Sequence, residues 1–466
     1  MIDAKIIDAA WRELKQSVVY FRGNPVGTVA ARDPSAAELN YSQCFTRDFA
    51  VSALAFLMRG ETDIVRNFLT VLVKLQSREK QMNCFKAGRG LMPASFTVQQ
   101  SKNGEELVPD FGERAIARVA PVDSGFWWLI LLRAYVQASG DVDLARKAEF
   151  QQAIKMIVEL SLVARFDMYP TLLVPDGGYM IDRRMGVYGY PLDIQSLFFT
   201  ALSAAQELLV GDETCLAAVA DRLAHLAYHI RRYYWLDLRR LNAIYRYKVE
   251  EYGQNIVNEF NIYPETIPPA LVDWMPSKGG YFAGNLGPAR MDFRYFAQGN
   301  LLAVVSSLAT AEQSQSIMDL IAQRWDDLIG QMPLKLCFPA LEGRDWAIVT
   351  GSDPKNSPWS YHNGGSWPFL LWLLAAAAQM TGRTELAKRA LETAADRLMV
   401  EDWSEYFDGR EGRLLGKEAR RFQSWTVAGF LSAQQLLANP THLNLLRYDE
   451  KALQGCIQPT EGGGGN

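Results

Sequence analysis

The sequence predicts an all-α protein whose helices pair into six hairpins that close into a ring. Apolar residues recur at helical spacing along the whole chain, and few stretches alternate as strands do. The connections between helices alternate between very short and very long. An open solenoid would instead repeat about every 30–45 residues with regular loops. Because the long connections here are irregular and rich in aromatic residues, a closed barrel is the favoured architecture.

Twelve helices are expected from the apolar spacing. In one of them Ile194, Leu197, Ala201 and Leu208 share a face, and Pro191 stands near the first turn, where its missing N–H costs nothing. The predicted helices span 2–20, 46–59, 62–78, 123–138, 142–164, 193–209, 213–234, 294–309, 311–328, 365–381, 383–400 and 420–438.

The short connections share one design, in which a glycine ends a helix and a polar side chain caps the next. The glycines are Gly60, Gly140, Gly211 and Gly382, and the caps are Thr62, Asp141, Asp212 and Thr384. Five helical hairpins result, and the first and last helices remain to pair with each other. Such a ring would place every long connection at one end, around a single cavity. Connections of this length in a compact chain usually carry function.

Composition narrows the class of protein. Of 466 residues, 49% are hydrophobic and 21% are charged, as in globular proteins. A net charge of −4 provides no basic field, so neither nucleic acid nor an anionic membrane is an expected partner. Five scattered cysteines without a CxxC pair indicate a reducing compartment, and acids in the first residues argue against a signal peptide, so a cytoplasmic protein is expected. One domain is predicted over 1–455, followed by a flexible tail at 456–466.

Several kinds of chemistry lack their motifs. The sequence has no phosphate-binding GxxxxGK[ST], no strand–GxGxxG–helix and no GxSxG. His225 and His229 have the i, i+4 spacing of metal ligands, but no third ligand accompanies them, which favours a structural role. Asp326 and Asp327 lack the third acid that a metal-dependent terpene cyclase would need. No metal or cofactor is therefore expected.

The long connections combine acids with Trp, Tyr, Asn and Arg, a mixture that suits a sugar. Paired carboxylates then remain as the means of catalysis, as in glycoside hydrolysis. The acids set among aromatic residues are Asp48, Asp123, Asp182, Glu265 and Glu405. The residues alone do not rank these five, and each could equally be a helix cap or a salt-bridge partner.

Seven motifs resemble the alkaline/neutral invertases of cyanobacteria and the plant cytosol, in the same order from about residue 40 to 438. They are NYSQCFTRDF, GLMPASF, RVAPVDSGFWW, YMIDRRMGVYGYPLDIQSLF, NIYPETIP, YHNGGSWP and WSEYFDG. The resemblance implies an (α/α)6 barrel, in agreement with the helix count. It also implies a homo-oligomer that hydrolyses sucrose to glucose and fructose, without a cofactor and with inversion.

The same resemblance assigns roles to residues. Asp182 corresponds to the general acid and Glu405 to the general base, and Arg47 with Asp48 would hold the reacting sugar. The other residues expected to bind substrate are Asp123, Arg184, Tyr190, Tyr361, His362, Asn363 and Trp367. Tyr190 and Ser404 depart from the plant members, which have His and Pro there, so only details of pocket shape are affected.

A general acid must keep its proton near neutral pH, whereas an adjacent guanidinium lowers the pKa of a carboxyl group. Two arginines follow Asp182 directly. In an extended segment Arg183 would point away from Asp182 and Arg184 would reach its side. We therefore expect at least one arginine to be held by other acids, carbonyls or sugar hydroxyls, and burial or a partner carboxylate to keep Asp182 protonated.

Two other functions are compatible with this sequence. One is hydrolysis of another small α-glucoside, such as trehalose or a glucosyl-glycerol-type solute. The other is a sugar-binding barrel without turnover, against which the presence of both Asp182 and Glu405 argues. A panel of disaccharides distinguishes the first, and a sensitive glucose-release assay distinguishes the second.

Overall fold

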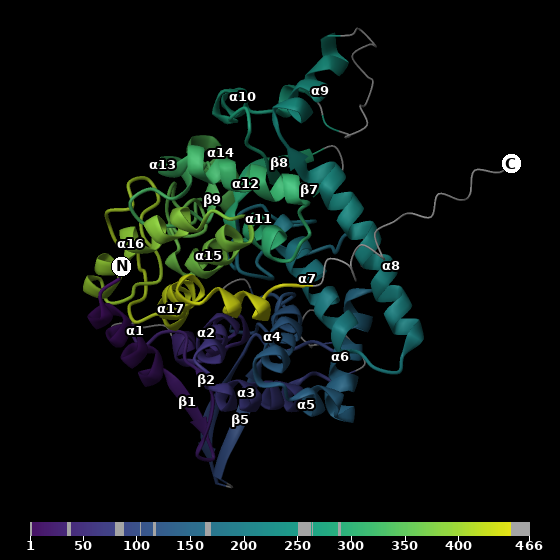
Figure 1. Ribbon diagram of the computed structural model, residues 1–466, viewed down its shortest axis with the longest axis vertical. Helices are drawn as coiled ribbons and strands as arrows, with labels where there is room; N and C mark the ends of the chain where they lie inside the picture. The colour runs from purple at the N-terminus through teal and green to yellow at the C-terminus, as the bar shows by residue number, and fades with distance from the viewer. Residues whose placement is uncertain are drawn as a thin grey trace, which may run out of the picture.

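The computed structural model is mainly helical, and short strands occupy parts of the long connections (Figure 1). It describes residues 2–34, 39–79, 88–102, 104–114, 118–163, 169–249, 262, 264–287 and 290–448. The predicted tail at 456–466 lies outside these residues, as do Cys84 and Cys456. None of the helices described is both long and apolar enough to cross a membrane.

Six helices are buried over nearly their whole surface because apolar and small residues follow one another without a polar stripe. They are α2 (Thr46–Met58), α4 (Ser124–Ser139), α7 (Leu192–Leu208), α11 (Ala297–Val305), α15 (Leu371–Met380) and α17 (Ser424–Ala438). Each packs against the next in chain order, and α17 also packs against α2. Figure 1 shows α17 lying between α15 and α2.

Six further helices bury one face only. They are α1 (Ala4–Gln16), α3 (Thr62–Leu75), α6 (Ala148–Ser161), α8 (Glu213–His229), α12 (Ala311–Gln323) and α16 (Thr384–Val400). In α1 the buried residues Ile6, Ala10 and Leu14 are four apart, which gives one apolar stripe. Each of α3, α6, α8, α12 and α16 packs on the buried helix that precedes it in the chain, and α1 packs on α17. The predicted pairing of the first and last helices is therefore confirmed.

The short turns between helices have the predicted glycines at the ends of the helices. Gly60, Gly140, Gly211 and Gly382 all have a positive φ, between 72° and 82°, a backbone region in which a Cβ atom is unfavourable. Asp141 and Asp212 cap the next helices by accepting hydrogen bonds from the N–H groups of Leu144 and Cys215. The other two predicted caps are wrong, because Thr62 and Thr384 are already the first residues of α3 and α16.

All twelve predicted helices are present, with differences at their ends. The helix predicted over 142–164 breaks at Lys147, whose ψ of 139° is extended, into α5 (Val142–Arg146) and α6. The helix predicted from 294 begins only at 297, because the preceding residues belong to a strand. Helix α13 (Trp325–Leu328) continues the helix predicted over 311–328, and η4 (Pro368–Leu370) begins the one predicted over 365–381.

The long connections hold structure that helical spacing did not indicate. Three helices were not predicted: α9 (Leu238–Val249), α10 (Pro269–Trp274) and α14 (Gly343–Thr350). The strands, also unexpected, form three small antiparallel sheets in the described part of the chain. The first sheet contains β1 (Val18–Phe21) and β2 (Asn24–Thr28), and the second contains β3 (Cys44–Phe45), β4 (Ser95–Ser101) and β5 (Gly104–Asp110). The third contains β6 (Trp235–Leu236), β7 (Tyr281–Gly287), β8 (Arg290–Phe296) and β9 (Cys337–Phe338). In Figure 1, α9 and α10 lie at one end of the long axis and β5 lies at the other.

Candidate active site

Loops that precede the buried helices line a hollow of about 820 Å³, open to solvent on one side. The segments that contribute lie within 40–48 before and in α2, 119–124 before α4, 177–182 before α7, 361–367 before η4, and 405–425 before α17. Because these helices all begin at the same end of the molecule, residues far apart in sequence meet there. Four of the five long connections converge on this cavity as predicted, whereas the connection over 235–293 contributes none of its described residues to the lining.

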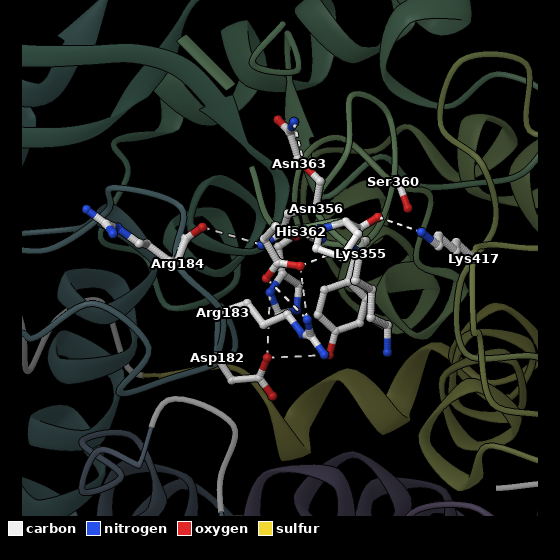
Figure 2. A network of polar contacts seen from close by, with 12 residues as sticks. Asp182, Arg183, Arg184, Lys355, Asn356, Ser360, His362, Asn363 and Lys417 are labelled. Carbon is white, nitrogen blue, oxygen red and sulfur yellow. Dashed lines mark hydrogen bonds and ion pairs between the residues drawn. The ribbon is translucent and has the colours of Figure 1, made fainter. Parts of the chain in front are cut away.

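Asp182 lies in this cavity with 32% of its side chain exposed. The Tyr361 hydroxyl donates a hydrogen bond to its Oδ1 at 3.4 Å, and His362 Nδ1 lies 3.7 Å from the same oxygen (Figure 2). Burial lowers the pKa of His362 well below its usual range, so the imidazole is neutral and adds no positive charge. Burial likewise raises the pKa of Asp182, although the Arg47 and Lys355 cations oppose this. The net shift is therefore upward, the direction that a general acid needs.

The side chains of Arg183 and Arg184, the two arginines after Asp182, are not placed as expected. Arg183 Nη1 pairs with both carboxylate oxygens of Asp353, at 3.0 and 3.2 Å, and its guanidinium lies 5.7 Å from the centre of the Tyr361 ring. Arg184 is exposed and points away from Asp182 (Figure 2). The expectation that Arg184 would share the side of Asp182 is thus wrong, because the chain bends at Arg183 and is not extended. The expectation that another acid holds one arginine is confirmed.

Glu405 is 3% exposed and is surrounded by donors. Its Oε1 accepts a hydrogen bond from the Tyr41 hydroxyl at 3.0 Å, and its Oε2 accepts one from the backbone N–H of Arg420 at 3.3 Å. Lys355 Nζ lies 3.8 Å from Oε2. Donors and a nearby cation both favour the ionised form of a carboxylic acid. Glu405 therefore accepts two hydrogen bonds beside a cation, whereas Asp182 accepts one from Tyr361.

Lys355 and Tyr41 were not predicted as site residues. Lys355 is 2% exposed, and its ammonium lies 4.1 Å from the centre of the Tyr361 ring, beside Glu405. A lysine in a polar loop gives no sign in sequence that it will be buried. Tyr41 belongs to the YSQCFTRD motif, which also contains Arg47 and Asp48. Its place in that motif was the sequence signal that could have indicated a site residue.

Arg47 and Asp48 in the first turn of α2 form a charged group with Asp123, the residue before α4. Arg47 Nε donates to Asp123 Oδ2 at 2.5 Å. Asp123 is 1% exposed and lies behind Arg47, while Arg47 and Asp48 line the cavity. Burial, with a smaller contribution from the nearby Glu405 and Asp182 carboxylates, raises the pKa of Asp48 to about 7 in spite of Arg47. The carboxyl groups of Asp48, Asp182 and Glu405, which all line one cavity, therefore interact electrostatically.

The raised pKa of Asp48 predicts a stability penalty at alkaline pH. An unfolded aspartate titrates near 3.9, so between about pH 4 and 7 the folded protein holds a proton that the unfolded chain has released. Stability therefore falls as pH rises through this window. The Asp48→Asn variant, uncharged at every pH, should be more stable than the wild type by up to about 4 kcal/mol at pH 8 and by about 1.5 kcal/mol at pH 5.

Urea denaturation at the two pH values measures this difference. Asp396→Asn, at an exposed position of α16, is the matched control and should change the free energy of unfolding by less than about 0.5 kcal/mol. A destabilised Asp48→Asn at pH 8, or an advantage that grows as pH falls, would contradict the expectation.

Aromatic rings form the wall beside the two carboxyl groups. Tyr361 stacks on His362 with centroids 3.9 Å apart, and His362 stacks on Trp367 at 5.3 Å. Trp367 also stacks on Tyr406 at 5.2 Å, and its Nε1 donates to the Tyr361 carbonyl at 3.0 Å. Trp367 belongs to the cavity lining, although only 1% of it is exposed. Its predicted contact with substrate stays a prediction.

The remaining predicted residues do not line the cavity. Tyr190 is buried, its N–H donates to Asn285 and its carbonyl accepts from Tyr234. Asn363 is fully buried, and its amide is used by the backbone of Leu341 and Asn356. Figure 2 shows Asn363 pointing away from Asp182. Among the alternative acids, Glu265 is exposed in η3 (Pro264–Thr266), outside the cavity lining.

The paired histidines of α8 contact aromatic rings. His225 packs on Tyr169 with centroids 5.1 Å apart, and His229 packs on Tyr233 at 5.0 Å. Within the described part of the chain, no three His, Cys, Asp or Glu side chains are grouped so that they could hold a metal ion. The contacts agree with the structural role expected for both histidines.

A family model described as "Alkaline and neutral invertase" matches residues 10–440. "Cytosolic invertase 1" of Oryza sativa subsp. japonica is 56% identical over 460 residues, which cover 97% of this chain and 82% of that protein. "Probable alkaline/neutral invertase D" of Arabidopsis thaliana is 55% identical over 451 residues, covering 96% and 84%. "Neutral/alkaline invertase 3, chloroplastic" of Oryza sativa subsp. japonica is 54% identical over 458 residues, covering 96% and 76%.

Solved structures share the fold at low identity. A glycosidase in complex with glucose has a TM-score of 0.55 at 13% identity and covers 96% of this chain and 100% of its own. A mannosylglycerate hydrolase of Thermus thermophilus has a TM-score of 0.53 at 13% identity, covering 92% and 99%. A bacterial glucoamylase complexed with acarbose has a TM-score of 0.52 at 12% identity, covering 90% and 52%. This chain therefore has the mainly helical fold of these glycosidases.

Proposed function

The chain belongs to the alkaline and neutral invertase family, whose members hydrolyse sucrose, and from this premise we propose that Asp182 is its general acid and Glu405 its general base. The observation that carries the assignment is the contrast between two carboxyl groups in one cavity. Burial raises the pKa of Asp182, whereas Glu405 accepts two hydrogen bonds and faces the Lys355 ammonium. Environments that separate two carboxyl groups in this way define an acid and a base.

The proposed reaction proceeds in one displacement. Asp182 protonates the oxygen that joins glucose to fructose, and Glu405 takes a proton from a water on the opposite face of the glucose ring. The water attacks the anomeric carbon as fructose leaves, so the configuration inverts. Arg47 and Asp48, which line the same cavity, would bind glucose hydroxyls. The inverting geometry needs carboxyl groups separated by about 6.5–9.5 Å.

The anomer released first tests this mechanism. With inversion, the α-linked glucose of sucrose appears as β-glucose, and oxygen from labelled water enters glucose. Proton NMR in the first minutes of cleavage, before mutarotation, should therefore show the β anomer. Initial α-glucose, or label in fructose, would contradict the roles of both carboxyl groups. Strong activity on another disaccharide with none on sucrose would instead favour a different small α-glucoside as substrate.

We infer that the chain forms one (α/α)6 barrel over 1–455. The six buried helices contact one another in chain order, and the contact between α17 and α2 returns to the start, as a closed inner ring requires. The six half-buried helices then form the outer layer. Each of α3, α6, α8, α12 and α16 follows its inner partner in the chain, and α1 pairs with α17.

We propose a cytoplasmic homo-oligomer. The relatives above are named as cytosolic in one case and chloroplastic in another, so the compartment of this chain rests on its own residues. Cys44, Cys215 and Cys337 are free thiols, as in proteins of a reducing compartment. Light scattering of the purified protein measures the number of subunits.

A further inference from the structure

A second cavity lies behind the wall of the candidate active site. It occupies about 1090 Å³, is open to solvent, and lies between α13, α16 and residues 409–413. Ser366 and Gly409 belong to its lining, while their near neighbours Trp367 and Glu405 line the first cavity. Figure 1 shows α13 and α16 on the same side of the molecule. Neither Asp182 nor Glu405 lines this second cavity, so failure of the sucrose assignment would leave it untouched.

The loops that separate the two cavities are packed backbone against backbone. Ser366 and Phe407 exchange two hydrogen bonds, of 2.9 and 2.8 Å. The Gly364 carbonyl lies where a side chain at Gly409 would have to be, so only glycine fits there. The second cavity is therefore a built part of the fold and not a gap between loose loops.

Positive side chains dominate the second cavity. Lys335, Arg389, Arg410 and Arg413 line it, against the acids Asp326 and Glu411. The chain as a whole has a net charge of −4, so this excess of cations is local. A concave surface with one sign of charge attracts the opposite ion.

Two of these cations form no direct ion pair with a carboxylate in the part of the chain that the structure describes. Lys335 is 4% exposed, and its Nζ donates to the Asp326 carbonyl at 2.9 Å. Burial lowers the pKa of Lys335 to about 8, although nearby aspartates oppose the shift. The Arg389 guanidinium lies 3.9 Å from the centre of the Trp325 ring, and within the described part of the chain it pairs with no carboxylate. The ring thereby holds the guanidinium plane in position, with its N–H edge available to a ligand.

The arginines of the 409–413 loop are partly engaged. Arg413 Nε donates to Gln331 at 3.2 Å and lies 3.7 Å from Glu411, and Arg410 pairs with Glu342 at 3.0 Å. These two arginines are mostly exposed at the rim, where they can reorient toward a ligand. Guanidinium groups bind phosphate through paired N–H donors, and an ammonium adds a point charge.

We propose that this second cavity binds a phosphate monoester or inorganic phosphate, with Lys335 at its base and Arg389 and Arg413 on its sides. A dianion matches the excess of two positive charges in the lining. Its terminal oxygens would accept hydrogen bonds from Lys335, Arg389 and Arg413.

Titration calorimetry with inorganic phosphate, and separately with a hexose 6-phosphate, tests the proposal on the full-length protein. Wild-type protein should bind with one saturable site per chain. Equal affinities identify phosphate itself as the ligand, and tighter binding of the sugar phosphate identifies the monoester. Arg389→Gln should weaken binding at least tenfold. Lys388→Gln removes a charge from the neighbouring position of α16, outside the cavity, and should change the affinity less than twofold.

Arg413→Gln is a second variant, for use if Arg389→Gln fails to keep the wild-type thermal midpoint. Saturating glucose should not displace phosphate. Displacement would place the ligand in the candidate active site and overturn the proposal. An equal loss of affinity in Lys388→Gln would show that phosphate is attracted by the positive charge of the surface in general and not by this cavity. Absence of saturable binding at millimolar concentrations would show that the cavity is not a phosphate site.

Discussion

Asp182→Asn should lower kcat for sucrose by about a thousandfold, within the 10²–10⁴ range of general acid catalysis. Fructose is a poor leaving group, and in the wild type Asp182 supplies the proton that it needs. Asparagine has nearly the same shape but holds no acidic proton. Because the pKa of Asp182 is raised by burial, the neutral amide should be accepted without loss of the fold. Steady-state kinetics and the thermal midpoint measure the two expectations.

A substrate whose leaving group needs no proton separates the role of the acid from a general loss of the site. Fluoride leaves as a stable anion, so Asp182→Asn should hydrolyse α-glucosyl fluoride within about tenfold of the wild-type rate. Loss of about a thousandfold on both substrates, as general base removal would give, would contradict the assignment of Asp182 as the acid.

Glu405→Gln should lower turnover of sucrose and of α-glucosyl fluoride alike, by about a thousandfold or more. Both reactions require an activated water, and glutamine cannot accept the proton. The Tyr41 hydroxyl and the Arg420 N–H donate to different oxygens of Glu405, so only one of them keeps an acceptor in the amide, and Lys355 loses its partner charge. The contrast between the two variants on the fluoride therefore identifies which carboxyl group is acid and which is base.

Glu385→Gln is the matched control for Glu405→Gln. Glu385 lies in the first turn of α16, is exposed, and pairs with Lys388. Its replacement should leave kcat for both substrates within about twofold, because exposed ion pairs contribute little. Retention of fluoride hydrolysis by Glu405→Gln at the wild-type rate would remove Glu405 from the role of base.

The helices could be predicted because apolar spacing is a local property of the chain. Inner and outer helices also differ locally: α15 is apolar all round, whereas α1 is apolar on one stripe. The strands of the long connections could not be predicted in the same way. Cys44–Phe45 and Cys337–Phe338, for example, are two-residue strands that exist only because a distant strand lies beside them.

The candidate acids could be found from the sequence, and the resemblance to a family ranked them. What neighbours each carboxyl group could not be found there. Lys355 in one loop faces Glu405 in another, and Asp353 draws Arg183 away from the acid that it follows. Asn363, which stands in a motif typical of a sugar site, instead holds the backbone of Leu341.

By itself, then, the sequence predicted the order of helices and the convergence of four of the five long connections, and its resemblance to a family pointed to two carboxyl groups. Only the tertiary structure decided which donors and cations surround each of them. The physical reason is that a pKa depends on burial and on charges within a few ångströms. Around Asp182 and Glu405 those charges come from residues 47, 183 and 355, which the fold alone brings together.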